Sequence, residues 1–318
     1  MFTQIECRNI SPQVASLREH LGVPDSLTHQ GKIYRVHSPQ VLVFNNTHDL
    51  SRHAVNLNQA RLTDYPERIP TFPTGGTWEE AYDIMATLPD ISRLLRQRRI
   101  ATVDEYWRLL KSDINYPMSY EFYTDKRIGE PHGLGPENWI RPNGAAEDPY
   151  QEAASFESEL RKECFAITNL GVGPDPKLAN GAVIPEDWND EAIEMAIKEE
   201  KAIEGSSHIG FVPKGISPDS GAIFVAIDRA TKEANKKYAP DPEHIPGGAI
   251  TQAHGDFRRA DLRVMAAIGP NKQRNVEKIL FEAPSPDNPA SMVTLGETVI
   301  LLDAKAAERT MKRLGLTP

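Results

Sequence analysis

The sequence has few of the features that would place it in a specialised class of proteins. It contains two cysteines, Cys7 and Cys164, in 318 residues, too few for a disulfide framework and without CxxC or Cys/His zinc spacing. No run of about 18 apolar residues occurs, so we predict no membrane-spanning helix. The first ten residues lack a basic start followed by an apolar stretch, so we expect no secretory signal. These absences predict a soluble, intracellular protein of the cytoplasm, or of the host cytoplasm or virion if it is viral.

The short motifs of the common nucleotide-binding and hydrolytic enzymes are also missing. We find no GxGxxG, no GxxxxGK[ST], no GxSxG and no kinase motif set, and each of these would have indicated a specific chemistry. A glycine-rich stretch at 171–176, GVGPDP, is typical of turns, because prolines offer no N–H to an anion. The motifs therefore identify no protein family.

An excess of positive charge is absent as well. The net charge is −9, and the negative charge is concentrated in residues 150–205, which hold 13 acidic and 5 basic residues. Residues 206–318 are slightly basic, with 15 basic and 13 acidic residues. This distribution argues against a nucleic-acid binder with a broad basic face. The acidic region could complement a basic cluster within one molecule or between copies.

The patterns that are present predict a mixed α+β fold. Residues 32–46 are rich in β-branched and aromatic residues and read as two strands, and residues 49–65 read as a helix. The capping-box pattern, Thr followed three residues later by Glu, occurs at Thr77–Glu80 and at Thr102–Glu105, and predicts a helix start at each. The N-terminal part is thus expected to be helix-rich with a small sheet.

The C-terminal part reads as strand–helix units. A short strand is predicted at 209–213. Two further strands, 221–228 and 296–303, each end in an aspartate that begins a helical pattern. Residues 127–149 hold four glycines and four prolines, which is loop composition. We therefore predict an N-terminal domain at 1–126, a linker or packed arm at 127–149, and a C-terminal α/β domain at 150–318.

The aspartates at the two strand ends, Asp228 and Asp303, allow two interpretations. Asp is a preferred N-cap, since its carboxylate accepts from the free N–H groups of the first helical turn. The same place is the carboxyl edge of an α/β sheet, where ligand sites gather. Together with His254 and Asp256, these residues are our candidate catalytic groups.

A histidine-rich segment is the candidate metal site. His37, His48, Asp49 and His53 lie close together in the sequence, and imidazole with carboxylate can hold a divalent metal. The spacing of five between the last two histidines departs from the four of zinc-binding helices. Exposed or hydrogen-bonded histidines are the alternative, and the cofactor is otherwise unknown.

Two basic clusters are candidate contacts for an anion or a partner. The first comprises Arg93, Arg96 and Arg99, with Arg98, and the second comprises Arg258 and Arg259, with Arg263, Lys272, Arg274 and Lys278. The first lies on a predicted helix, where arginines form a solvated face, and the second could line an anion site.

These observations favour a binding or assembly protein with protein partners or self-association, such as a virion or phage subunit. The grounds are the absence of catalytic motifs, 25 prolines and the segregated charge. The alternative is an enzyme with a carboxylate and histidine site at the carboxyl edge of the C-terminal sheet. A second alternative is a nucleic-acid-associated protein.

Overall fold

Continuous apolar runs in several segments form one parallel sheet. The structure is a computed structural model that describes residues 26–29, 32–35 and 39–316. Its seven-stranded sheet has the order β3-β14-β13-β8-β4-β5-β7, and every neighbouring pair is parallel. The strands are β3 (Gln40–Phe44), β4 (Ile69–Phe72), β5 (Ile100–Thr102), β7 (Trp139–Ile140), β8 (Phe165–Gly171), β13 (Leu262–Ala267) and β14 (Thr298–Asp303).

Three smaller antiparallel sheets accompany it. One has the order β11-β12-β6, and the other two are the pairs β1-β2 and β10-β9. Their strands are β1 (Ser26–His29), β2 (Lys32–Arg35), β6 (Asp104–Tyr106), β9 (Lys177–Leu178), β10 (Ala202–Ile203), β11 (Ile223–Ala226) and β12 (Gly248–Thr251).

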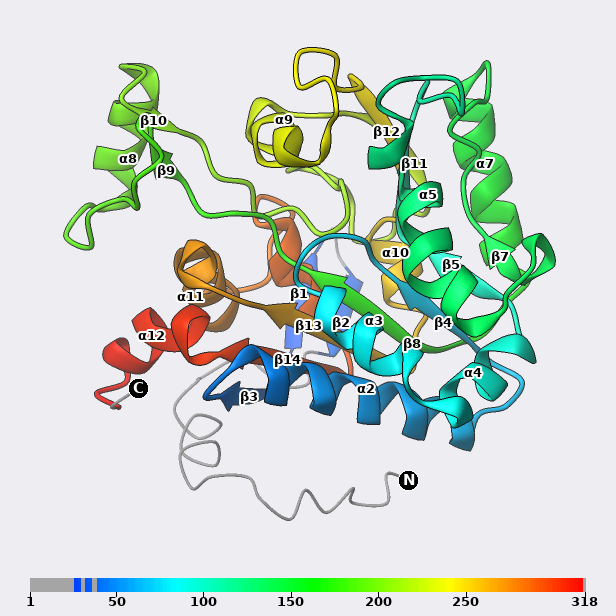
Figure 1. Ribbon diagram of the computed structural model, residues 1–318. Coiled ribbons are helices and arrows are strands. Elements are labelled where there is room, and N and C mark those ends of the chain that lie inside the picture. Colours follow the sequence, from blue (N-terminus) through cyan, green and yellow to red (C-terminus); the bar gives the residue numbers. More distant parts are fainter. Residues whose placement is uncertain (1–25, 30–31, 36–38, 317–318) are drawn as a thin grey trace.

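Helices cover both faces of the parallel sheet (Figure 1). The helices are α2 (Thr47–Asp64), α3 (Glu79–Ala86), α4 (Pro89–Arg96), α5 (Tyr120–Thr124), α6 (Glu130–His132), α7 (Pro149–Leu160), α8 (Asp190–Lys198), α9 (Arg229–Asn235), α10 (His254–Phe257), α11 (Gln273–Phe281) and α12 (Ala304–Arg313). The 3₁₀ segments are η1 (Tyr116–Met118), η3 (Pro136–Asn138), η4 (Lys236–Tyr238), η5 (Pro270–Lys272) and η6 (Pro289–Thr294), and η2 (Asp125–Gly129) is a π-helical segment.

Alternate residues of the strands supply the two cores. Leu301 packs into the core shared with α2, α3 and α4, whereas Ile300 packs into the core shared with α11 and α12. A strand that buries both faces must be largely apolar, which explains the apolar run of β14. Burying each such side chain stabilises the fold by about 1.5–3 kcal/mol. The prediction of a mixed fold with strand–helix units in the C-terminal part is confirmed.

The order of the strands creates a switch point between β4 and β8. From β4 the chain moves outward to β5 and β7, and then returns to β8 and continues in the other direction through β13 to β14. Ligands of open α/β sheets bind at such a point, outside the carboxyl ends of the strands. The segments following β4 and β8 therefore lie where a site is expected.

Two local predictions were wrong. The capping-box pattern at Thr102–Glu105 begins no helix, because these residues end β5 and form most of β6. Residues 209–213, predicted as a strand, form a turn, where the N–H of Phe211 bonds to the Thr251 hydroxyl at 3.2 Å. In both places tertiary pairing overrides the local pattern.

The predicted division into two domains stays a prediction. The parallel sheet draws β3, β4 and β5 from the first part and β8, β13 and β14 from the last. Residues 127–149 contribute β7, whose Trp139 is buried. In the described part of the chain, no helix is long and apolar enough to cross a membrane. Cys164 is a free, exposed thiol, and Cys7 lies outside the described residues.

Residues 177–203 form an excursion that projects from the sheet at the upper left of Figure 1. Its ends pair as β9 and β10, and α8 packs on them through a small core of its own. Ion pairs fasten it to the rest of the molecule, including Lys278 to Asp190 at 2.8 Å. The excursion carries much of the negative charge noted in the sequence.

Candidate active site

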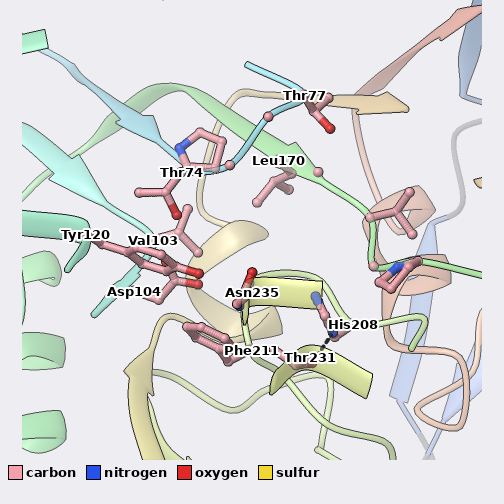
Figure 2. A pocket seen from close by; sticks show the side chains of 18 of the residues that line it. Thr74, Thr77, Val103, Asp104, Tyr120, Leu170, His208, Phe211, Thr231 and Asn235 are labelled. Atoms are coloured by element: carbon pink, nitrogen blue, oxygen red, sulfur yellow. Dashed lines mark hydrogen bonds between the residues drawn. The ribbon is translucent and has the colours of Figure 1, made fainter. Parts of the chain in front are cut away.

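A pocket of about 370 Å³ opens at the switch point of the sheet. Its walls come from the segments that follow four parallel strands: 73–77 after β4, 103–104 after β5, 171–174 after β8 and 268–272 after β13. Residues 208–211 and the α9 region close the remaining side. Figure 2 shows Asp104 and Tyr120 on one side of the pocket and His208 on the other. The site thus brings together groups up to about 200 positions apart.

A glycine-containing turn leads from β4 to α3 along the pocket. Gly75 has a φ of +97°, a left-handed conformation that side chains disfavour. A Cβ on the next residue, Gly76, would stand 3.4 Å from the Tyr238 hydroxyl, so the backbone approaches the opposite wall closely. A strand, a glycine turn and a helix in this order form a common cradle for anions.

Two lysines supply positive charge to the pocket. Lys272 follows β13, and its ammonium donates to the Val172 carbonyl at 2.6 Å. Burial lowers the pKa of Lys272 to about 8, with Asp175 opposing and Lys237 adding to the decrease. The exposed Lys237 also lines the pocket. Two cations that line the same pocket as a glycine turn favour a phosphate group.

Asp104 is the buried acid of the pocket. Only 5% of its surface is exposed, and burial, followed by the nearby charge of Glu105, raises its pKa well above the usual range. A carboxyl group whose pKa is raised can both take up and release a proton near neutral pH. Its neighbour in Figure 2 is Tyr120, whose ring stacks on Phe211 at 5.6 Å. Asp104 thus stands at an aromatic wall.

Glu105 holds this wall in place. Its carboxylate accepts from the backbone N–H groups of Tyr106, Tyr120 and Glu121 at 2.7, 3.0 and 2.5 Å, and from the Ser119 hydroxyl at 3.0 Å. Burial raises its pKa to about 7, although these hydrogen bonds favour the charged form. The carboxylate therefore ties the start of α5 to β6 and positions Tyr120.

Replacing Glu105 with glutamine should lower the free energy of unfolding by about 1–3 kcal/mol, because its amide group would turn a donor toward buried donors. Urea unfolding followed by circular dichroism measures the change. Glu121→Gln, which alters an ion pair with the exposed Lys111, is the matched control and should change stability little. Equal unfolding midpoints for both variants would contradict the role given to Glu105.

His208 faces the pocket from the opposite side. Its Nδ1 lies 2.6 Å from the Ser206 hydroxyl and 3.3 Å from the Thr231 hydroxyl, and Figure 2 shows the second of these contacts. Burial lowers the pKa of His208 to about 4, with Lys272 adding to the decrease and Asp228 opposing it. The ring is therefore neutral at pH 7 and can exchange a proton with a bound hydroxyl.

The two strand-end aspartates both cap helices. Asp228 accepts from the N–H of Thr231 at 2.6 Å, and Asp303 accepts from the N–H groups of Ala306 and Gly269 at 2.8 and 3.0 Å. Neither lines the pocket. Asp228 is nevertheless linked to His208 through Ser206, whose hydroxyl donates to it at 3.4 Å.

The other two candidate catalytic residues lie elsewhere. His254 and Asp256 belong to α10, which precedes β13, so they are at the amino edge of the sheet, opposite the pocket. Both are buried; burial lowers the pKa of His254 to about 4 and raises that of Asp256 to about 6. The structure does not bring them together with Asp303 or Asp228, and a catalytic role for them stays a prediction.

The candidate metal residues are dispersed. His48 bonds to Glu80 at 2.8 Å, Asp49 accepts from the Asn46 amide at 2.8 Å, and the ring of His53 lies 5.3 Å from that of Phe44. Among the residues that the structure describes, no group of three or more His, Cys, Asp or Glu could hold a metal ion. His37 lies outside those residues, so the metal site stays a prediction.

The arginine clusters make contacts within the molecule, away from the pocket. Arg93 pairs with Asp90 at 3.0 Å, Arg96 donates to the His132 carbonyl at 3.2 Å, and Arg99 pairs with Glu159 and Glu163 at 3.3 and 3.0 Å. In the second cluster, Arg258 pairs with Asp219 at 2.9 Å and Arg259 donates to the Leu160 carbonyl at 2.9 Å. Only Lys272 of the wider second cluster lines the pocket, and a partner contact by the arginines stays a prediction.

Comparison with known proteins relates this chain to enzymes that act on phosphorylated sugars. Glucosamine-6-phosphate deaminase 1 of Bacillus subtilis (strain 168) is 28% identical over 262 residues, which are 81% of this chain and 94% of that protein. The deaminase of Lysinibacillus sphaericus is 27% identical over 230 residues, covering 72% and 86% of the two chains. No family model matches the sequence.

Solved structures agree with this relationship. A monomeric glucosamine-6-phosphate deaminase, described as a missing link of the NagB superfamily, superposes with a TM-score of 0.69 at 25% identity, covering 85% of this chain and 99% of that one. A 6-phosphogluconolactonase from Trypanosoma cruzi has a TM-score of 0.58 at 16% identity, covering 88% and 98%, which is a similarity of fold alone.

These findings correct the preferred interpretation of the sequence. We expected a binding or assembly protein, with a virion or phage subunit as an example, but the relatives are metabolic enzymes that match this chain along most of their length. The absence of familiar motifs was misleading, because this site is assembled from the ends of separate strands. The alternative interpretation, an enzyme with its site at a carboxyl edge, is the one that the relatives support.

Proposed function

We propose that this protein deaminates a phosphorylated 2-amino sugar, with glucosamine 6-phosphate as the substrate to test first. The observation that carries the proposal is the arrangement at the switch point, with a buried acid, a neutral imidazole and two lysines beside a glycine turn. The relatives are glucosamine-6-phosphate deaminases, which supplies the reaction class.

The chemistry of such a deamination requires proton transfers that the side chains of the pocket can carry out. The open-chain amino aldose must lose a proton from C2 and gain one at C1. The C2 amine also gives up one proton and the C1 carbonyl oxygen gains one, so that C2 carries an imine and C1 becomes a hydroxymethyl group. Water then adds to C2 and ammonia leaves, so that one substrate and one water give a ketose phosphate and ammonia. A carboxyl group that shuttles one proton between adjacent carbons fits Asp104, because burial and Glu105 raise its pKa.

The remaining groups bind and orient the substrate. Lys272 and Lys237, with the turn at Gly75 and Gly76, hold the phosphate. The stacked rings of Tyr120 and Phe211 form an apolar face for the carbon chain of the sugar. His208 lies across the pocket from Asp104, where it can exchange a proton with a sugar hydroxyl.

The test is the release of ammonia, measured by coupling to glutamate dehydrogenase. Glucosamine 6-phosphate should give ammonia and fructose 6-phosphate in equal amounts. Glucosamine without phosphate should be at least about 100-fold poorer in kcat/KM, since it makes no charged contact with Lys272. Failure to release ammonia from any phosphorylated 2-amino hexose would reject the proposal.

We further propose a cytoplasmic location. A charged phosphate ester does not cross a bilayer unaided, so the enzyme must work in the compartment where the ester is formed. Fractionation of cells that express the untagged protein tests this location, with the soluble fraction as the expected result. Self-association stays a prediction that native mass spectrometry can test.

A further inference from the structure

The imidazole of His208 is connected to a carboxylate that lies outside the pocket. Ser206 donates to Asp228 Oδ2 at 3.4 Å, and the same hydroxyl oxygen lies 2.6 Å from His208 Nδ1. Ser206 and Thr231 are buried, whereas Asp228 is exposed. Asp228, Ser206 and His208 thus form a chain of hydrogen bonds from the surface to the pocket.

The backbone around this chain is held firmly. The Ser206 N–H donates to the Pro174 carbonyl at 2.8 Å, and the Asn275 amide donates to the Ser206 carbonyl at 3.1 Å. The N–H of Gly173 donates to the His208 carbonyl at 3.0 Å. A Cβ on Gly173 would stand 2.1 Å from the Ser206 carbonyl oxygen, so this packing requires glycine. The hydroxyl and the imidazole therefore face each other in a defined geometry.

The chain has a direction, because a carboxylate can only accept a hydrogen bond. The single proton of the Ser206 hydroxyl points to Asp228, and its oxygen is then an acceptor toward His208. Nδ1 must carry the ring proton to complete the 2.6 Å contact. Since the low pKa keeps the ring neutral, Nε2 has no proton. The other partner of Nδ1, the Thr231 hydroxyl at 3.3 Å, can accept from the same N–H.

We propose that Asp228, acting through Ser206, is a positioning residue that fixes His208 in the tautomer with an unprotonated Nε2. In this tautomer the imidazole accepts a proton from a sugar hydroxyl; in the other it could only donate. The catalytic use of this tautomer, acceptance of a proton from a sugar hydroxyl, rests on the proposed function. The assignment of the tautomer itself does not. A surface carboxylate thus decides which way the pocket imidazole moves a proton.

The decisive variant is Asp228→Asn, because it keeps the helix cap but reverses the direction of the hydrogen bond between residue 228 and Ser206. The amide oxygen must remain at the position of Oδ1 to accept from the Thr231 N–H at 2.6 Å. The NH₂ group then occupies the position of Oδ2 and donates to Ser206. The Ser206 proton turns to His208 Nδ1, which becomes an acceptor, and the ring proton moves to Nε2.

Long-range ¹H–¹⁵N correlation spectra of uniformly labelled protein at pH 7 report the tautomer without substrate. The signals of His208 are identified by their loss in His208→Gln. We expect a protonated Nδ1 and an unprotonated Nε2 in the wild type, and the reverse in Asp228→Asn. Asp303→Asn, the matched change at the cap of α12, should leave the His208 signals unchanged.

Activity supplies a second readout. Ser206→Ala should lower kcat about 10- to 100-fold with little change in KM, as expected when general acid–base catalysis is impaired but not abolished. Ser206→Thr, which keeps the hydroxyl, should restore most of the rate. A wild-type His208 with its proton on Nε2, or an Asp228→Asn spectrum identical to the wild type, would overturn the inference. The expected tautomers without any ammonia release would instead reject the proposed function alone.

Discussion

Replacing Asp104 with asparagine should lower kcat for ammonia release by about 10³-fold, within the range that general acid–base groups contribute, while KM changes only a few-fold. Asparagine has nearly the same shape and can keep the contacts with bound sugar, but it cannot carry a proton between carbons. Steady-state kinetics with glucosamine 6-phosphate measures both constants.

The melting temperature of the variant distinguishes a loss of catalysis from misfolding. Burial disfavours the charged form of Asp104, so a neutral amide should leave the melting temperature unchanged or raise it. Asp64→Asn, at the exposed end of α2, is the matched control and should keep the wild-type rate. A variant at Asp104 that keeps more than about a tenth of the rate would remove this residue from the mechanism.

The same substitution has a signature in the pH profile. A carboxylate that acts as a base works only when ionised, so activity should fall as the pH falls through the raised pKa of Asp104. This acid limb should disappear in Asp104→Asn. Persistence of the limb would assign it to another group.

Lys272→Met should raise KM for glucosamine 6-phosphate on the order of 100-fold, since truncating one member of a buried charged pair costs about 2–5 kcal/mol. Methionine fills a similar volume but offers no donor. Inhibition by inorganic phosphate should be lost in parallel. Lys278→Met, which removes a surface pair with Asp190, is the control, and an unchanged KM for Lys272→Met would place the phosphate elsewhere.

The pKa of Lys272 adds a dependence on pH to this contact. Burial lowers that pKa to about 8, so the free enzyme loses the positive charge as the pH rises through 8. Phosphate binding should weaken above this pH by up to about tenfold per unit, and Lys272→Met should show no such dependence.

Much of the fold could be predicted from the sequence because its periodicities are local. The helix predicted at 49–65, with Leu50, Ala54 and Leu57 on one side, corresponds to α2. The run that ends at Asp303 is apolar on both faces, and it forms a strand buried on both sides. The short strands could not be predicted in this way, because three residues such as 104–106 carry no measurable period.

The site was harder to predict for a different reason. Asp104 and Glu105 lie in a pattern that resembles a capping box, and only pairing with β12 shows them to be a strand. His208 lies in neither a helix nor a strand. Its partner Ser206 is two residues away, but Thr231 and Asp228, which complete its surroundings, follow some 20 residues later. Lys272 belongs to the second basic cluster of the sequence, but only the topology of the sheet shows that it lines the pocket while the arginines of that cluster do not.

The excursion at 177–203 has a consequence for the evolution of this fold. Its two ends are neighbours in the β9–β10 pair, and its apolar residues pack mainly on one another. Residues can therefore be gained or lost within it at a small cost in loop-closure entropy, and the registers of β8 and β13 are unaffected. The neighbouring residues Pro174 and Asn271 line both the pocket and a second cavity against the excursion. Selection can thus remodel the rim of the pocket by changing this excursion, while the groups at the strand ends are inherited intact.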